Sequence, residues 1–145
     1  SIGCTRCAGG EGTSIGSHED YIYKNLMTLV KDVYPELRAR DIVPTCEPEF
    51  ACYALVMLAN RRTYQTAIQD LYCSLPERSR KSKEVRLAME LAEAQQTGNY
   101  VRFFSALRRE STPYLVCCLS HQHLHVIRDR ALHTMVESRD RKIAI

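Results

Sequence analysis

Two cysteines near the start of the chain have the residue type and the spacing of a zinc-binding pair. Cys4 and Cys7 form a Cys-x-x-Cys motif, and structural zinc takes four such ligands in a tetrahedron. The next cysteine, Cys46, lies 39 residues after Cys7. His18 is a candidate third ligand, but no fourth ligand is evident. The motif by itself therefore predicts neither a metal centre nor a bound cofactor.

Histidines form a second group with metal-binding chemistry. His121, His123 and His125 alternate, and His133 follows eight residues later. On a helix, His121 and His125 would share a face, as zinc-binding histidine pairs do. However, no carboxylate lies between them, and catalytic zinc needs a general base nearby. We expect these histidines to lie at a turn between two helices, partly exposed.

Motifs for nucleophilic or phosphate chemistry are absent from the sequence. It contains no Gly-x-Ser-x-Gly, no P-loop and no Gly-x-Gly-x-x-Gly. Glu90 and Glu93 fall on a predicted helix, where surface charge is their ordinary role. We predict a binding module without catalysis and without a small-molecule substrate. The alternative from another class is a zinc- or thiol-dependent enzyme that uses Cys4, Cys7 and the histidines.

Basic residues are the remaining group that could do chemistry. Residues 1–75 hold 7 Lys/Arg and 9 Asp/Glu, whereas residues 76–145 hold 13 and 8, so the net charge changes from −2 to +5. A basic half of this kind suits nucleic acid or an acidic partner. The candidate contacts are Arg78, Arg80, Lys81, Lys83, Arg108, Arg109, Arg128 and Arg130.

Short helices must position all of these side chains. Five of the six glycines fall in residues 1–17, which we interpret as an irregular Gly/Cys leader. Residues 18–145 are predicted to form one all-α domain of stacked antiparallel helical hairpins, because helix-period apolar stripes alternate with short connections. No apolar run is long enough to span a membrane.

The expected helix boundaries follow from caps, prolines and apolar spacing. Ser17 caps the first helix, Pro35 breaks or kinks it, and residues 41–48 form a connector. Six further helices are expected over about 50–59, 64–75, 83–97, 100–109, 113–119 and 124–137, with a polar turn at 79–83.

The fourth helix, over about 83–97, has sequence signals at both ends. Ser82 is expected to cap its start, Gly98 to follow its end, and Asn99 to cap the fifth helix. Its apolar face is expected to carry Val85, Ala88 and Ala92.

Specific side chains are expected in the core of these helices. The inward residues of the sixth and seventh helices are predicted as Leu115, Cys118, Leu119, Leu124, Ile127, Ala131 and Met135. The cysteines inside helices are interpreted as buried apolar residues: Cys52, Cys73, Cys117 and Cys118.

Several runs in the second to seventh helices are similar to those of a known family. The most specific run is Asn99-Tyr100-Val101-Arg102-Phe103-Phe104, and the others begin at Glu49, Ser82, Pro113 and Ile127. Together they resemble GANP-type messenger-RNA export scaffolds over about residues 20–136. The motif residues are Glu49, Phe50, Tyr53, Asn99, Tyr100, Phe103, Phe104, Tyr114 and Leu115. We expect them to be structural, with Tyr114 and Leu115 packed against the aromatic residues of the fifth helix.

The resemblance implies a PCI-type helical subdomain, without the winged helix that follows it in the family. It also implies a nuclear scaffold, at the nuclear pore, that binds another PCI-domain protein and a small acidic subunit, with RNA as a further partner. The alternative within binding modules is a PCI-type subunit of another assembly, such as the proteasome lid or a translation-initiation complex. A third hypothesis is direct RNA binding through the basic second half.

Overall fold

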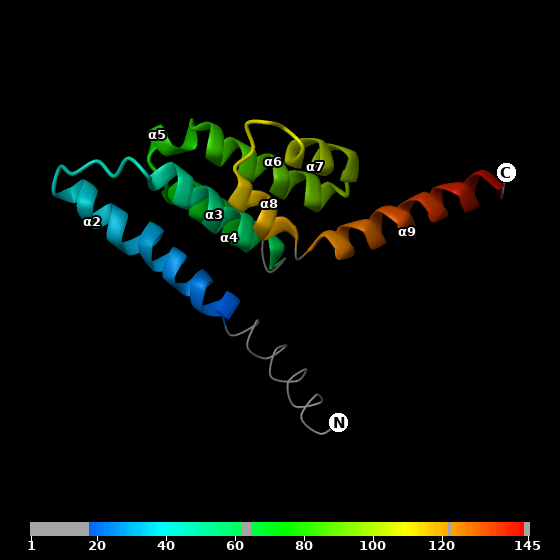
Figure 1. Cartoon of the computed structure of the whole chain (residues 1–145), viewed down its shortest axis with the longest axis horizontal. Coiled ribbons are helices and arrows are strands. Elements are labelled where there is room, and N and C mark those ends of the chain that lie inside the picture. Colours follow the sequence, from blue (N-terminus) through cyan, green and yellow to red (C-terminus); the bar gives the residue numbers. More distant parts are fainter. Residues whose placement is uncertain (1–17, 62–64, 122, 144–145) are drawn as a thin grey trace, which may run out of the picture. The chain divides into compact units, whose positions relative to one another are not determined.

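The computed structural model describes residues 18–61, 65–121 and 123–143, and every regular element in this part of the chain is a helix. This confirms the predicted all-α class. The chain divides into two compact units, residues 1–44 and 45–145 (Figure 1). The predicted leader, with Cys4 and Cys7, lies outside the described residues. None of the described helices has both the length and the apolar character that crossing a membrane requires.

The first unit holds a continuous helix that passes through a proline. An α-helical stretch over 18–28 continues into the π-helical turn η1 (Leu29–Val33) and then into α2 (Tyr34–Ala39). The amide of Tyr34 donates to the Leu29 carbonyl, five residues back. Because this turn is wider than an α-helical turn, Pro35 is accommodated without ending the helix. Instead of the predicted break or kink at Pro35, the helix changes from α-helical to π-helical geometry just before the proline and then continues as an α-helix.

The second unit contains seven helices in its described residues: α3 (Glu47–Asn60), α4 (Gln65–Ser74), α5 (Glu77–Arg80), α6 (Lys83–Thr97), α7 (Tyr100–Leu107), α8 (Tyr114–His121) and α9 (Leu124–Ile143). The predicted connector over 41–48 was too long, because Glu47 and Pro48 lie in the first turn of α3. Proline suits that position, since an amide there has no helical partner.

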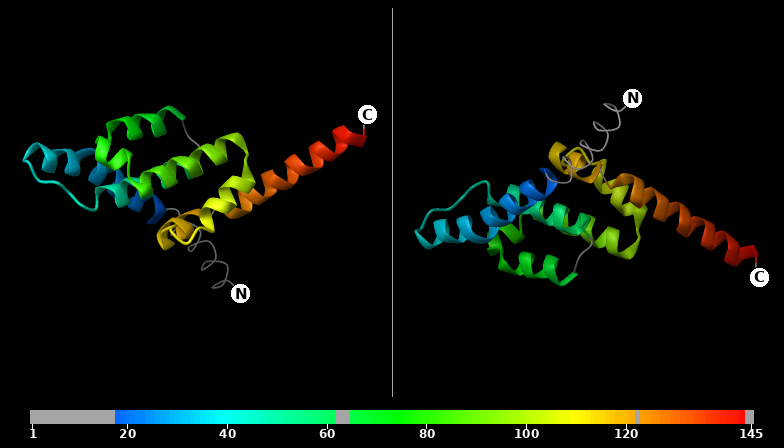
Figure 2. Two further views of the ribbon diagram at one scale, coloured as in Figure 1. Left: turned by 90° about the horizontal axis from the view of Figure 1, so that it is seen from above. Right: turned by 90° about the horizontal axis from the view of Figure 1, so that it is seen from below.

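The core of this unit lies between α3 and α6, which run side by side in both views of Figure 2. Ala51, Ala54 and Leu55 of α3 are buried, as are Val85 and Ala88 of α6. The alanines let the two backbones approach closely, and each large aliphatic side chain contributes about 1.5–3 kcal/mol through its burial. The predicted apolar face of the α6 region is thus confirmed.

Two capping residues at the start and end of α6 behave as predicted. The Ser82 side chain accepts a hydrogen bond from the amide of Val85 at 3.3 Å. Gly98 follows the helix with φ of +71°, in the left-handed region that glycine adopts without strain. The side chain of Asn99 then accepts from the amide of Arg102 at 3.1 Å and begins α7. This two-residue connection folds α6 and α7 into a hairpin.

The predicted polar turn over 79–83 is partly wrong. Residues Glu77–Arg80 form the short helix α5, and Ser79 is buried. Pro76 precedes α5 with an extended backbone, and the amide of Arg80 donates to the Pro76 carbonyl at 3.0 Å. Pro76 therefore precedes one turn of α-helix in a stretch that the sequence predicts to be an irregular polar turn.

The inward face of α8 differs from the prediction. Val116 and Ser120 are buried, whereas Leu115 is 52% exposed and Cys118 is exposed. Leu119, the third predicted residue, is half-buried. Small side chains, rather than the largest apolar ones, thus meet α3, because the helices approach closely there.

Helix α9 is longer than predicted, and its side chains over 132–140 are exposed. It continues to Ile143 rather than ending at Glu137. Ile127 and Ala131 are buried as predicted, but Met135 is 47% exposed and Leu124 is half-buried. The charged residues over 137–140 are exposed, and such residues on a solvated helix need no core to pack against.

The helical cysteines are not uniformly buried. Cys52 is buried as predicted, but Cys73 and Cys118 are exposed and Cys117 is half-buried. Cys73 and Cys118 occupy positions of α4 and α8 that face solvent. The apolar character of cysteine therefore does not by itself determine whether a cysteine in a helix faces the core or solvent.

A buried amide connects three helices of the second unit. Asn60, at the end of α3, accepts a hydrogen bond from Gln95 of α6 at 3.2 Å. Its own amide group donates to the Leu119 carbonyl of α8 at 3.1 Å. Asn60 is only 8% exposed, so both bonds compensate for the loss of water around a polar side chain.

Candidate nucleic-acid interface

The α6–α7 hairpin brings basic residues from distant parts of the sequence together. The end of α7 returns to the middle of α6, where both guanidinium nitrogens of Arg109 contact the carboxylate of Glu90 at 2.7 Å. The short helix α5 leads directly into the first turn of α6. The helix α5 and the first half of α6 therefore extend from the point where α7 ends, and we call this stretch, from α5 to Glu90 together with Arg108 and Arg109, the basic end.

Glu90 is the acidic centre of this region. Besides Arg109, it contacts the Nε of Arg102 at 3.4 Å. Arg102 also contacts Glu93 at 3.4 Å. The hydrogen bonds from Arg109, with its charge and that of Arg102, hold the pKa of Glu90 below its usual value against a smaller opposing effect of burial. Two acidic and two basic side chains thus neutralise each other.

Most other cations of the basic end are not neutralised by an acidic side chain in the described part of the chain. Four exposed side chains form no ion pair with any described residue: Arg78, Lys83, Arg86 and Arg108. Lys81 pairs with Glu77 at 2.6 Å, with both side chains largely exposed. Arg80 is half-buried, and its Nε is buried without a hydrogen bond in the described part of the chain. Phosphate groups are the natural partner of such unpaired cations.

Arg86 belongs to this region although sequence reasoning missed it. It lies three residues after Lys83 and four before Glu90, so the three residues follow one exposed stripe of α6. That spacing was visible in the sequence. The candidates were instead chosen from clusters in loops and at helix ends, which overlooked a single arginine inside a helix.

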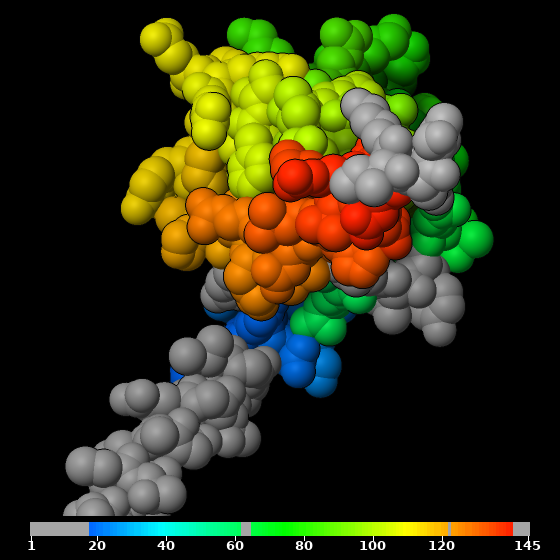
Figure 3. Space-filling view, turned by 90° about the vertical axis from the view of Figure 1, so that its right-hand side faces the viewer, coloured from blue at the N-terminus to red at the C-terminus, as the bar shows by residue number. Residues whose placement is uncertain are grey.

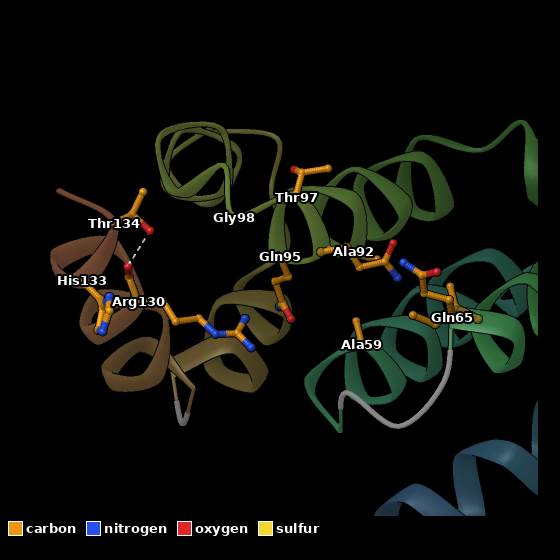
Figure 4. Close-up of a pocket in the computed structure, with 11 residues that line it drawn as sticks. Ala59, Gln65, Ala92, Gln95, Thr97, Gly98, Arg130, His133 and Thr134 are labelled. Atoms are coloured by element: carbon orange, nitrogen blue, oxygen red, sulfur yellow. Dashed lines mark hydrogen bonds between the residues drawn. The ribbon is translucent and has the colours of Figure 1, made fainter. Parts of the chain in front are cut away.

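Two of the predicted cations lie elsewhere. Arg128 and Arg130 are exposed residues of α9. Arg130 lines a cleft of about 530 Å³ together with Gln95 and Gly98, at the opposite end of α6 from Lys83. Figure 4 shows the Arg130 side chain reaching from α9 toward Gln95. The eight predicted contacts therefore form two groups, six at the basic end and two on α9, of which Arg130 lines this cleft.

The same cleft has a mixed lining. Its wall includes Ala59, Ile68 and Ala92, and its polar residues include Gln65 and His133. Figure 3 looks onto this side of the second unit, with α9 directly below the α6–α7 hairpin. Of its polar side chains, His133 also contacts the carboxylate of Glu137, with both side chains largely exposed.

The motif residues of α3 form a local structural cluster. The hydroxyl of Tyr53 donates to the carboxylate of Glu49 at 2.7 Å, and the Phe50 and Tyr53 rings meet edge to face at 5.9 Å. Burial, and then the bond to Glu49, raise the pKa of Tyr53 to about 12. Burial likewise raises the pKa of the neighbouring Cys52 thiol to about 12, so it is not a thiolate nucleophile at neutral pH.

The motif residues of α7 and α8 behave differently from each other. Phe103 is buried and meets Phe104 edge to face at 5.7 Å, while Tyr100 is half-buried. Tyr114, however, is 80% exposed, and Leu115 is also exposed. The predicted packing of Tyr114 and Leu115 against the aromatic residues of α7 is therefore wrong, because α8 turns its Val116 face inward.

Three of the four predicted histidines lie near the turn between α8 and α9, as expected, whereas His133 lies in the middle of α9. His121 ends α8 and His125 is in the first turn of α9, both exposed, and His123 between them is half-buried. His133 contacts Glu137 at 3.2 Å. Among the described residues, no three His, Cys, Asp or Glu side chains gather where they could hold a metal ion.

Comparisons with known proteins agree on one family. The family model described as "SAC3/GANP family" matches residues 17–144. The chain is 32% identical over 133 residues to SAC3 family protein B of Arabidopsis thaliana, and 30% identical over 115 residues to Protein xmas of Drosophila melanogaster. These matches cover 87% and 79% of this chain, but only 8% and 5% of the relatives. A further relative, SAC3 family protein A of Arabidopsis thaliana, is 27% identical, with 80% of this chain and 11% of the relative covered. No solved structure matches the chain.

Proposed function

Because the chain belongs to the SAC3/GANP family, we propose that it is a non-catalytic helical module of a messenger-RNA export scaffold and that its basic end contacts RNA. The observation that carries the RNA contact is the group of four exposed cations of the basic end that form no ion pair with a described residue. The predicted PCI-type architecture and the nuclear location, at the nuclear pore, belong to the same proposal.

The charge balance of the hairpin favours an anionic polymer as the partner. Glu90 and Glu93 are occupied by Arg102 and Arg109, so they repel phosphate less than free carboxylates would. Lys83 and Arg86 lie on the same helix within about 10 Å of Glu90, at 1.5 Å per residue. A flexible single strand can follow such a line of cations and release its bound counterions.

A protein partner is the second part of the proposed scaffold role. The outward face of α8 carries Tyr114, Leu115 and Cys118, all exposed. A neighbouring group of exposed aromatic and aliphatic side chains is typical of a surface that another protein covers. We assign this face to the second PCI-domain protein, and the basic end also suits a small acidic subunit.

The RNA contact is tested by the salt dependence of binding. A labelled single-stranded RNA is titrated with the wild-type chain and with Lys83→Gln/Arg86→Gln, and fluorescence anisotropy is measured over a series of salt concentrations. Each lost phosphate contact lowers the slope of log K against log salt by about 0.7 for single strands. We expect a slope smaller by about 1.4 in the double variant.

The control removes the same charge from the other unit. Lys31→Gln/Arg40→Gln lowers the net charge by two at exposed positions. We expect this control to bind RNA nearly as the wild type does. If both double variants lost RNA affinity equally, binding would depend on net charge alone, and the basic end would be rejected as the contact.

The protein contact is tested by co-purification from cells that express the full-length protein. Tyr114→Ala/Leu115→Ala is expected to lose the second PCI-domain protein, whereas Val101→Ala, at an exposed apolar position of α7, keeps it. If the wild type brought down proteasome-lid or translation-initiation subunits instead, the export role would be wrong.

A further inference from the structure

The turn between α7 and α8 carries a residue pattern that the proposed RNA contact does not explain. Arg108-Arg109-Glu110-Ser111 places two arginines two and three residues before a serine. Some protein kinases select substrates by this charge pattern, because acidic residues in their substrate groove bind the two guanidinium groups. We propose that Ser111 is a phosphorylation site for an arginine-directed protein kinase, and that its phosphate competes with Glu90 for Arg109.

The local structure makes Ser111 accessible. Arg108, Glu110 and Ser111 are exposed, and the Ser111 side chain makes no hydrogen bond to any described residue. The segment lies outside both helices, in a turn closed by the hydrogen bond from the amide of Thr112 to the Arg109 carbonyl at 3.1 Å. Few bonds must open for the segment to extend into a kinase groove, which favours modification here over modification within a helix.

The adjacent Thr112 is a poorer acceptor, although Pro113 follows it. Its hydroxyl donates to the Ala106 carbonyl at 2.6 Å and is half-buried. Phosphorylation of Thr112 would remove this bond from the end of α7. The free hydroxyl of Ser111 meets no such cost, so the two neighbouring hydroxyls differ in reactivity for a structural reason.

The reaction requires ATP as the co-substrate. The γ-phosphoryl group is transferred to Ser111 Oγ: the bond between phosphorus and the ADP oxygen breaks as the Oγ–phosphorus bond forms, and the catalytic base of the kinase accepts the hydroxyl proton. The product carries a charge of about −2 at neutral pH.

The new phosphate lies beside a cation that already has a partner. Arg109 is two residues from Ser111 and is held by Glu90. The Arg109 side chain is 47% exposed, so it can reach toward the turn. A dianionic phosphate attracts a guanidinium more strongly than a carboxylate does. Phosphorylation would therefore weaken the contact between α6 and the end of α7 and lower the positive charge of the basic end.

The site is tested with the purified chain, the catalytic subunit of an arginine-directed kinase and Mg-ATP. We expect one phosphoryl group, located on Ser111 by peptide mass spectrometry. Ser111→Ala loses it, and Arg108→Ala incorporates it much more slowly, whereas Thr112→Ala and Arg86→Ala behave as the wild type does. No incorporation, incorporation elsewhere, or an unchanged rate in Arg108→Ala would overturn the proposal.

The competition is tested on the phosphorylated chain by following the phosphorus NMR signal against pH. Glu90→Gln leaves the kinase motif intact and releases Arg109, so the phosphate pKa should fall below that of the wild-type phosphoprotein, by about one unit. Glu93→Gln is the matched control, because Glu93 contacts Arg102 rather than Arg109. Equal phosphate pKa values in the two variants would reject the competition.

Discussion

Helices α7 and α8 are consecutive, equally long and both begin with a tyrosine, yet they use their apolar residues in opposite ways. In α7 the large aromatic Phe103 is buried in the core. In α8 the large side chains of Tyr114 and Leu115 face solvent, and Val116 and Ser120 are buried instead. The comparison teaches that the space left by the neighbouring helix decides which residues are buried. In α8, which contacts α3, the two buried side chains are smaller than the exposed Tyr114 and Leu115.

Phe103→Ala is expected to have the largest effect on stability. It removes a fully buried ring and leaves a cavity, so the free energy of unfolding should fall by about 3–5 kcal/mol. Urea unfolding followed by circular dichroism measures this change. A loss no greater than that of a surface variant would mean that α7 does not anchor the core.

Val116→Ala and Leu115→Ala test the orientation of α8 directly. Val116 is fully buried, and removing its two methyl groups should cost about 2 kcal/mol. Leu115 is exposed, and its truncation should change stability by less than about 0.5 kcal/mol. The same urea experiment compares the two, and the reverse order would place the originally predicted face inward.

Asn99→Ala tests the start of α7. It removes the side-chain acceptor for the Arg102 amide, and the expected loss is about 1 kcal/mol. Asn99→Asp keeps an acceptor and should restore most of the stability. If the aspartate variant were as unstable as the alanine variant, the hydrogen bond would not be the cause.

The smallest expected effect is the pH dependence that Glu90 confers. Its pKa is lowered in the folded state, so its stabilising contribution is present above the ordinary glutamate pKa and is lost as pH falls through the lowered value. Wild type and Glu90→Gln should therefore differ most near neutral pH and converge in acid. Unfolding midpoints in urea at several pH values measure this. A difference independent of pH would assign the effect to packing.

Local sequence rules predicted much of this fold because their causes are local. Ser82, Gly98 and Asn99 have the backbone or capping roles that their residue types favour. The apolar face of α6 follows helical spacing, because that helix is covered along much of its length by α3 and α7. The same spacing failed for α8, where two faces are comparably apolar and only tertiary packing distinguishes them.

The candidate site was less predictable than the fold. Most of the basic residues were identified from composition, but the pairing of Arg109 with Glu90 joins residues 19 positions apart. Such contacts depend on how the hairpin closes, which residue spacing alone does not specify. Arg86 was missed for a different reason: its spacing from Lys83 is visible in the sequence, but a single arginine inside a helix does not form a cluster of basic residues.

The π-helical turn in the first unit changes the phase of its helix. A residue in an α-helix advances by about 100° around the axis, and the wider turn at Leu29–Val33 takes up one residue more than an α-helical turn would. Side chains from the end of this turn onward therefore point in directions that counting from residue 18 does not give. Val33 is at helical spacing from the apolar residues Leu29 and Val30 and is 40% exposed, whereas the next residue, Tyr34, is 4% exposed. The π-helical turn before Pro35 thus rotates the side chains that follow it about the helix axis.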